Sequence, residues 1–364
     1  MKKLFPLSII QIAIVAAGLT FMQSCTPDDD EPTYDVPTTY NFTNVNYSGQ
    51  TYRLSMLEEI LDYCVTARVS GTTLSATTLK NMFANSGSPF SDATLNGSGK
   101  QLKNKCYAAD QSLVESYIDS LVLASQSVTA GSNGVAGIVV SSAEPGSKYV
   151  LSAKGWDYTE MIEKGVMGGV FYYQAIDTYL ENISDDDNNT ITAGEGTDME
   201  HHFDEAFGYF GVPVNFPTNN TDVLFWGEYC NDMDAALGSN AKLMNAFLAA
   251  RAAITNKDYT TRDEKIIVIR ENWDALVAAA AIHEINEAIE YFGDDALRSH
   301  TLTEFVGFVQ SLKYNIHAKI TPAQISEVTG HIGTNLYNVT LTDLNAAKNL
   351  LSAIYGLDNI KDSL

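Results

Sequence analysis

The stretch IIVIRENWDALVAAAAIHEINEAIEYFG, residues 266–293, constrains the fold more than any other part of the chain. Drawn as a helix, it is apolar on nearly every side at its centre. Such a helix has to be covered by other protein segments all round, because no side of it suits contact with water. We therefore predict a helix over 262–292 at the heart of a helical bundle.

The rest of the chain is also helical in pattern, and no long strand pattern competes. A helix is predicted to begin near Tyr52, because the apolar residues that follow recur at spacings of three and four: Leu54, Leu57, Ile60, Leu61 and Cys64. Further helices are predicted over 76–85, 100–125, 155–183, 200–210, 241–255, 296–317, 322–330 and 341–354. Residues 129–153 place β-branched residues amid Gly and Ser, which predicts a loop or a short hairpin. The fold class is therefore predicted to be all-α.

Three glycines interrupt the apolar helix predicted over 155–183. Gly165, Gly168 and Gly169 would each cost about 1 kcal/mol relative to alanine inside a helix. A neighbouring helix that approaches closely would explain them, because only glycine leaves room for such an approach.

Residues 1–25 have the layout of a lipoprotein signal peptide. Two lysines precede an apolar run that ends at Met22, and Ser24 precedes Cys25, whose thiol would accept the lipid. The alternative is an uncleaved N-terminal anchor. Both interpretations place the body of the protein outside the cytoplasm, and the lipid on Cys25 would attach it to the outer membrane.

Residues 26–39 are predicted to form an acidic, flexible tether, because sequence rich in Asp, Pro and Thr cannot bury enough apolar area to order itself. The acidic run from Asp28 to Glu31 resembles the signal that carries some lipoproteins to the outer face of the outer membrane. The alternative is an ordinary solvated tether. Display at the cell surface and at the periplasmic face both stay open.

The charge balance excludes one class of partner. The chain has 45 acidic and 22 basic residues, and its net charge is −23. Nucleic acid is excluded, because phosphate binding needs a basic surface. The negative electrostatic field of the protein suits cations, cationic ligands or a basic partner surface better. A role in solubility alone would also explain the charge.

The cysteines other than Cys25 are Cys64, Cys106 and Cys230, so at most one disulfide can form and one thiol is left over. The sequence does not decide whether Cys64 and Cys106 form this disulfide. There is no CxxC or CxxCH motif, so a redox motif, a covalently attached haem and a thiolate zinc finger lack their usual spacing.

The first candidate site is the segment EHHFDEAFGYF. On a helix, His202 and Glu205 are three residues apart and His201 and Glu205 are four apart, so each pair shares a face. A carboxylate beside an imidazole suits metal ligation and proton transfer equally well. The alternative is a structural role, in which the acidic residues favour the helix N-terminus and the histidines pair with them.

A second candidate is the segment HEINEAIE, in which His283 and Glu287 lie one turn apart. It resembles the zincin motif HExxH, but Glu287 occupies the position of the second histidine, so the motif is incomplete. No bundle helix carries a di-iron ExxH, and no Ser/His/Asp signature, P-loop or Rossmann fingerprint occurs. The isolated His300, His317 and His331 are predicted to be surface or capping residues.

Four segments carry a family resemblance: NYSGQTYRLSMLEEI, GKQLKNK, GWDYTEMIEKGVMGGVFYYQ and EHHFDEAFGYFGVP. Together they resemble domain-of-unknown-function family 4856, a family of lipoproteins related to the imelysin superfamily. The resemblance implies an imelysin-like all-α fold of two helical bundles packed together, with a site between them. We expect the N-terminal bundle at 40–210 and the C-terminal bundle at 211–364.

Imelysins carry a GxHxxE motif, whose histidine and glutamate match His202 and Glu205, whereas Glu200 replaces its glycine. The superfamily includes a described peptidase and proteins associated with iron or haem acquisition. No activity of the family carries over to this chain. From the export signal, the acidic balance and the HxxE turn we expect a non-enzymatic lipoprotein that binds iron, haem or zinc through His202 and Glu205. His201, His283 and Glu287 are expected to support these ligands or to be further ligands. An outer-membrane transporter is a candidate partner. The alternatives are an imelysin-like metallopeptidase and a structural partner of an outer-membrane complex.

Overall fold

Helices account for 63 % of the computed structural model and strands for 4 %, so the all-α prediction is confirmed. The structure describes residues 34–364. The predicted signal peptide, Cys25 and most of the tether lie outside the described residues. No helix within 34–364 combines the length and the apolar character that crossing a membrane requires.

The longer helices are α1 (Ser48–Val65), α4 (Gln111–Ser125), α6 (Asp198–Phe210), α9 (Ser239–Asn256), α10 (Tyr259–Glu290), α11 (Asp295–Ser311) and α13 (Leu341–Tyr355). The shorter ones are α2 (Ala76–Ala84), α3 (Ala93–Gly97), α5 (Tyr158–Val166), α7 (Trp226–Asp232), α8 (Asp234–Leu237) and α12 (Pro322–Ile332). A π-helix, η4 (Met167–Leu180), continues directly from α5. The strands β1 (Gly137–Val140) and β2 (Lys148–Leu151) pair antiparallel as a hairpin, with Gly137 opposite Leu151.

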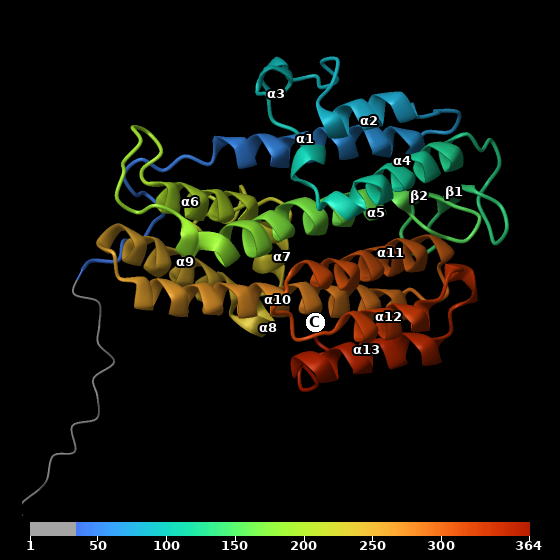
Figure 1. Ribbon diagram of the computed structural model, residues 1–364. Coiled ribbons are helices and arrows are strands. Elements are labelled where there is room, and N and C mark those ends of the chain that lie inside the picture. The colour runs from blue at the N-terminus through green and yellow to red at the C-terminus, as the bar shows by residue number, and fades with distance from the viewer. Residues whose placement is uncertain (1–33) are drawn as a thin grey trace, which may run out of the picture. The chain divides into compact units, whose positions relative to one another are not determined.

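Helix α10 lies at the centre of the helices, as the sequence predicts. Every residue from Leu276 to Ile282 is buried. Helices α9, α11 and α13 pack against α10 along its length (Figure 1). The hydrophobic effect therefore places the most uniformly apolar segment where neighbouring helices cover every side of it.

One continuous hydrophobic core extends from Tyr40 to Leu357. The residues from Val36 to Leu364 form a single compact unit, in which α6 packs on α9 and α5 packs on α11. The predicted division into bundles at 40–210 and 211–364 stays a prediction. Cys64, Cys106 and Cys230 are buried free thiols, so the bond between Cys64 and Cys106 is not formed.

Two of the predicted helices differ from the structure in more than their end residues. The helix predicted over 100–125 begins only at Gln111, because 103–105 and 108–110 form separate 3₁₀ turns and Cys106 between them is extended. The helix predicted over 155–183 changes to π geometry after Val166. Gly168 and Gly169 do meet close neighbours, whereas Gly165 does not. A Cβ on Gly168 would lie 2.7 Å from Ser311 Cβ of α11.

Replacing Gly168 with alanine is expected to lower the free energy of unfolding by about 1 to 2 kcal/mol, because overpacking outweighs the better helix propensity of alanine. Gly165→Ala is the matched control. Its new Cβ would have an ordinary contact, 3.5 Å from Tyr117 Cε2. We expect Gly165→Ala to leave stability unchanged or to raise it by up to about 1 kcal/mol. Urea denaturation of both variants measures the difference, and equal effects would contradict the role of Gly168 in close packing.

A buried ion pair network joins α6 to α9. Arg251 of α9 is fully buried, its Nε donates to Asp204 Oδ1 over 2.7 Å, and an Nη1 hydrogen bond of 2.8 Å reaches Glu200 Oε1. The Tyr40 hydroxyl also donates to Asp204 Oδ1, over 2.8 Å. The N-terminal segment that carries Tyr40 is thus held on the helix pair by charge-assisted hydrogen bonds.

Candidate metal centre

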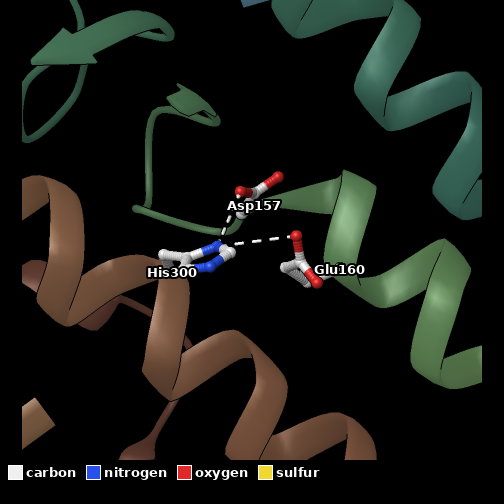
Figure 2. Close-up of side chains that lie close together, drawn as sticks. All are labelled: Asp157, Glu160 and His300. Carbon is white, nitrogen blue, oxygen red and sulfur yellow. Dashed lines mark hydrogen bonds and ion pairs between the residues drawn. The ribbon is translucent and has the colours of Figure 1, made fainter. Parts of the chain in front are cut away.

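Asp157, Glu160 and His300 form the one group of three His, Cys, Asp or Glu side chains within residues 34–364 whose candidate ligand atoms all lie within 4.8 Å of one another. Asp157 immediately precedes α5, Glu160 lies in the first turn of α5, and His300 lies in the second turn of α11. Figure 2 shows the three side chains pointing toward one another from these two elements. The group therefore depends on the packing of α5 against α11.

N-terminal caps fix the first turns of the two helices that carry these side chains. Asp157 is the N-cap of α5, since its side chain accepts a 3.0 Å hydrogen bond from the Thr159 backbone N–H. Asp294 caps α11 by accepting hydrogen bonds from the Ala296 and Leu297 backbone N–H groups. Carboxylate caps stabilise both helix starts, because they satisfy N–H groups that have no partner inside the helix.

The spacing of the three residues suits a bound metal ion. His300 Nδ1 lies 3.2 Å from Asp157 Oδ2 and 3.5 Å from Glu160 Oε1. Ligand atoms about 2.0 to 2.2 Å from a zinc ion lie about 3.0 to 3.6 Å from each other. Both distances to the imidazole fall in that range, and the ligand atoms of Asp157 and Glu160 lie within 4.8 Å of each other, so the three side chains could close around one ion.

The other side of the His300 ring is held as well. Its Nε2 lies 3.1 Å from Glu304 Oε1, one turn further along α11. The ring also stacks on Tyr149 of β2, with 4.2 Å between the ring centroids. A carboxylate on the second nitrogen is the usual partner of a metal-binding histidine, because it fixes the orientation of the ring and makes it a better ligand.

A buried lysine balances part of this negative charge. Lys164 Nζ lies 2.8 Å from Glu163, 3.1 Å from Glu304 and 3.4 Å from Glu160. Its stem crosses α11 at Gly307, where an added Cβ would lie 2.5 Å from Lys164 Cβ. Gly307 therefore lets the lysine reach the carboxylates.

The cluster shifts the protonation of its members. Burial alone would lower the pKa of His300, but Glu160, Asp157 and Glu304 raise it to about 9. Burial and the charge of Glu304 raise the pKa of Glu160 to about 8. Burial would raise the pKa of Glu304, yet Lys164 and His300 hold it below its usual range. At neutral pH His300 is thus an imidazolium, and a metal ion would have to displace its proton.

His300 and Glu304 also line a separate cavity of about 240 Å³. The carboxylates that line this acidic cavity are Glu228, Asp232, Glu284, Glu287 and Glu304. His283 completes its charged lining together with His300, whereas Asp157 and Glu160 do not line it. The imidazole of His300 therefore lies between two acidic regions, with the metal candidate on one side and the acidic cavity on the other.

A family model described as "Domain of unknown function (DUF4856)" matches residues 37–354. The chain belongs to this family. No curated protein and no solved structure gives a significant match. The predicted relationship of this DUF4856 chain to the imelysins stays a prediction.

In this DUF4856 protein, His202 and Glu205 contact different residues and do not pair with each other. His202 Nδ1 lies 2.8 Å from Asp186 Oδ2, and the side chain is 39 % exposed. Glu205 Oε1 instead accepts a 2.7 Å hydrogen bond from Gln50 Nε2 and lies 3.9 Å from His201 Nε2. Neither residue belongs to a group of three candidate ligands in the described part of the chain. A metal site at His202 and Glu205 stays a prediction.

His283 and Glu287 do pair on α10, as their spacing predicts, with 3.6 Å between Nε2 and Oε1. Both side chains are more than a third exposed and line the acidic cavity. They do not form a group of three ligands with any other residue of 34–364. Their role as further metal ligands stays a prediction.

The prediction that His300 is a surface or capping residue is wrong. Its side chain is only 19 % exposed and contacts three carboxylates. The sequence around His300 gave little indication of a metal site, because the segment HTLTE at 300–304 contains one histidine and one glutamate four residues later. Asp157 lies 143 residues away along the chain, so only the packing of α5 on α11 brings the group together.

Proposed function

We propose that this DUF4856 protein is a non-enzymatic, lipid-anchored protein of the cell envelope that binds a divalent metal ion through Asp157, Glu160 and His300. The observation that carries the proposal is the setting of His300. Its Nδ1 faces two carboxylates and its Nε2 faces a third, Glu304. That is the arrangement in which one nitrogen ligates a metal ion and the other is oriented by a carboxylate.

The donor set limits the choice of metal. One imidazole and two carboxylates suit zinc, ferrous iron or manganese, whereas copper(I) would prefer sulfur ligands. Haem fits less well, because its iron needs a histidine nitrogen directed at open space. Both nitrogens of His300 lie within 3.5 Å of carboxylate oxygens. We therefore favour a metal ion, namely zinc, ferrous iron or manganese, over haem.

The envelope location rests on the sequence of residues 1–25. Lipid on Cys25 would hold the protein at the outer membrane, and the net charge of −23 would raise the local concentration of cations near its surface. An outer-membrane transporter that supplies or receives the metal stays a candidate partner.

The test is a calorimetric titration of the full-length lipoprotein in detergent, stripped with EDTA, with Zn²⁺, Fe²⁺ and Mn²⁺. We expect one ion per chain. Asp157→Asn is expected to weaken binding at least about tenfold, because it removes a charged ligand. Asparagine is also a good N-cap, so α5 should keep its start.

His202→Gln is the matched control, because it removes the histidine that the family motif suggests and leaves α5 and α11 untouched. We expect it to bind metal as the wild type does. No bound ion, or an affinity that falls with His202→Gln and survives Asp157→Asn, would refute the site proposed here. Far-UV circular dichroism would show that both variants are folded.

A further inference from the structure

The acidic cavity contains a carboxyl group that has no partner in the protein. Glu284 of α10 lines the cavity, and only 6 % of the residue is exposed. Its carboxyl group has no hydrogen bond and no ion pair with any other residue of 34–364. Burial and the charge of Glu304 raise the pKa of Glu284 well above its usual range, so its ionised form lacks a counter-charge, which a cationic ligand would supply.

The surroundings of Glu284 select a cation. Four further carboxylates line the same cavity, of which Glu228 and Asp232 are exposed. The only basic side chains in the lining are His283 and His300. Carboxylates outnumber the basic side chains in this lining five to two, and a cavity with an excess of negative groups concentrates cations.

One wall already holds an alkylammonium group. Lys164 Nζ lies 3.1 Å from Glu304 and 5.1 Å from the centre of the Tyr229 ring, and Tyr229 donates a 2.9 Å hydrogen bond to Glu304. A carboxylate beside an aromatic face is a good environment for an organic ammonium ion. Glu304 and Tyr229 also line the cavity.

The spacing of the lining favours an ammonium ion over a second bare metal ion. The cavity residues alone do not supply three ligand atoms within 4.8 Å of one another, since the only such group in residues 34–364 uses Asp157 and Glu160. An ammonium group needs a single carboxylate at about 2.7 to 2.9 Å. The cavity volume of about 240 Å³ is many times the roughly 10 to 15 Å³ that one water molecule needs on the same measure, so a short diamine has room.

We propose that the acidic cavity binds a small alkyl diamine, with one ammonium group on Glu284 and the other among the exposed carboxylates. This binding goes beyond the proposed metal function and does not depend on it. The diamine occupies the Nε2 side of His300, whereas the metal ion would lie on the Nδ1 side.

The test is a calorimetric titration of the full-length lipoprotein with 1,4-diaminobutane in EDTA. We expect saturable binding of one diamine per chain, and no binding of the neutral analogue 1,4-butanediol. Glu284→Gln is expected to weaken diamine binding at least about tenfold, because a glutamine amide cannot form an ion pair with the ammonium group. Glu290→Gln is the matched control. It removes an exposed carboxylate from the same helix outside the cavity, and should leave the affinity unchanged.

Two cross-checks separate this proposal from the metal site. Asp157→Asn should keep diamine binding, and Glu284→Gln should keep metal binding. Far-UV circular dichroism would show that Glu284→Gln is folded. If Glu284→Gln does not fold, Glu287→Gln replaces it, with an expected loss of about threefold or more. The proposal would be overturned if the wild type showed no saturable diamine binding. It would also be overturned if the cavity variant, Glu284→Gln or its replacement Glu287→Gln, bound the diamine as tightly as Glu290→Gln does.

Discussion

Replacing Arg251 with methionine is expected to lower the free energy of unfolding by about 3 to 5 kcal/mol, the largest effect that we expect of one substitution. Methionine fills much of the same space, but it leaves Asp204 and Glu200 without their buried cation. Asp204 is itself fully buried. Removing one partner of a buried ion pair leaves a charge that neither water nor protein stabilises.

Urea denaturation measures this loss. Lys80→Met is the matched control, because Lys80 pairs with Asp119 at the surface, where such pairs contribute up to about 1 kcal/mol. A second variant, Arg251→Met with Asp204→Leu, is expected to recover part of the loss by removing the uncompensated charge as well. A loss below about 1 kcal/mol in Arg251→Met would contradict the structural role of the network.

Raising the pH from 7 to 9.5 is expected to destabilise the metal-free protein by about 2 to 4 kcal/mol through the His300 cluster. The folded pKa of His300 is about 9, against 6.5 in the unfolded chain, because the stabilisation by Glu160, Asp157 and Glu304 outweighs the effect of burial. The folded pKa of Glu160 is raised from 4.5 to about 8 by burial and Glu304. Between pH 7 and 9 the folded state therefore binds more protons than the unfolded state, and stability falls as the pH rises.

Urea denaturation in EDTA at several pH values measures the slope. His300→Gln is expected to reduce the slope to the part that Glu160 contributes, because the variant has no imidazolium to lose. His317→Gln is the control, since that histidine is 53 % exposed and pairs only with Glu181. Equal slopes for the two variants would show that His300 does not carry the pH dependence.

The fold could be predicted further than the site. Periodicity locates α10 and most of its neighbours within a few residues, because burial of one face leaves a regular pattern along a helix. It fails over 100–110, where two short 3₁₀ turns resemble the start of α4, and at η4. The π-helix η4 is buried on so many sides that its apolar pattern does not reveal its geometry.

The candidate metal centre left almost no pattern in the sequence. Asp157 and Glu160 resemble the ordinary acidic start of a helix, and His300 is isolated. The conspicuous double histidine at 201–202 instead binds carboxylates separately, because His202 turns toward Asp186 while His201 lies near Glu205. Local spacing indicates which residues share a helix face, but it does not indicate which helices meet.

A single carboxylate also ties the β-hairpin to the helix that carries His300. Asp294 Oδ1 caps α11, while its Oδ2 accepts hydrogen bonds from Ser141, Ser142 and Ala143 directly after β1. Burial would raise the pKa of Asp294, but these donors hold it well below its usual range, so the tie persists in mild acid. Detachment of the hairpin and fraying of α11 thus become one cooperative event, and the amide protons of both segments would exchange with solvent through the same transient opening.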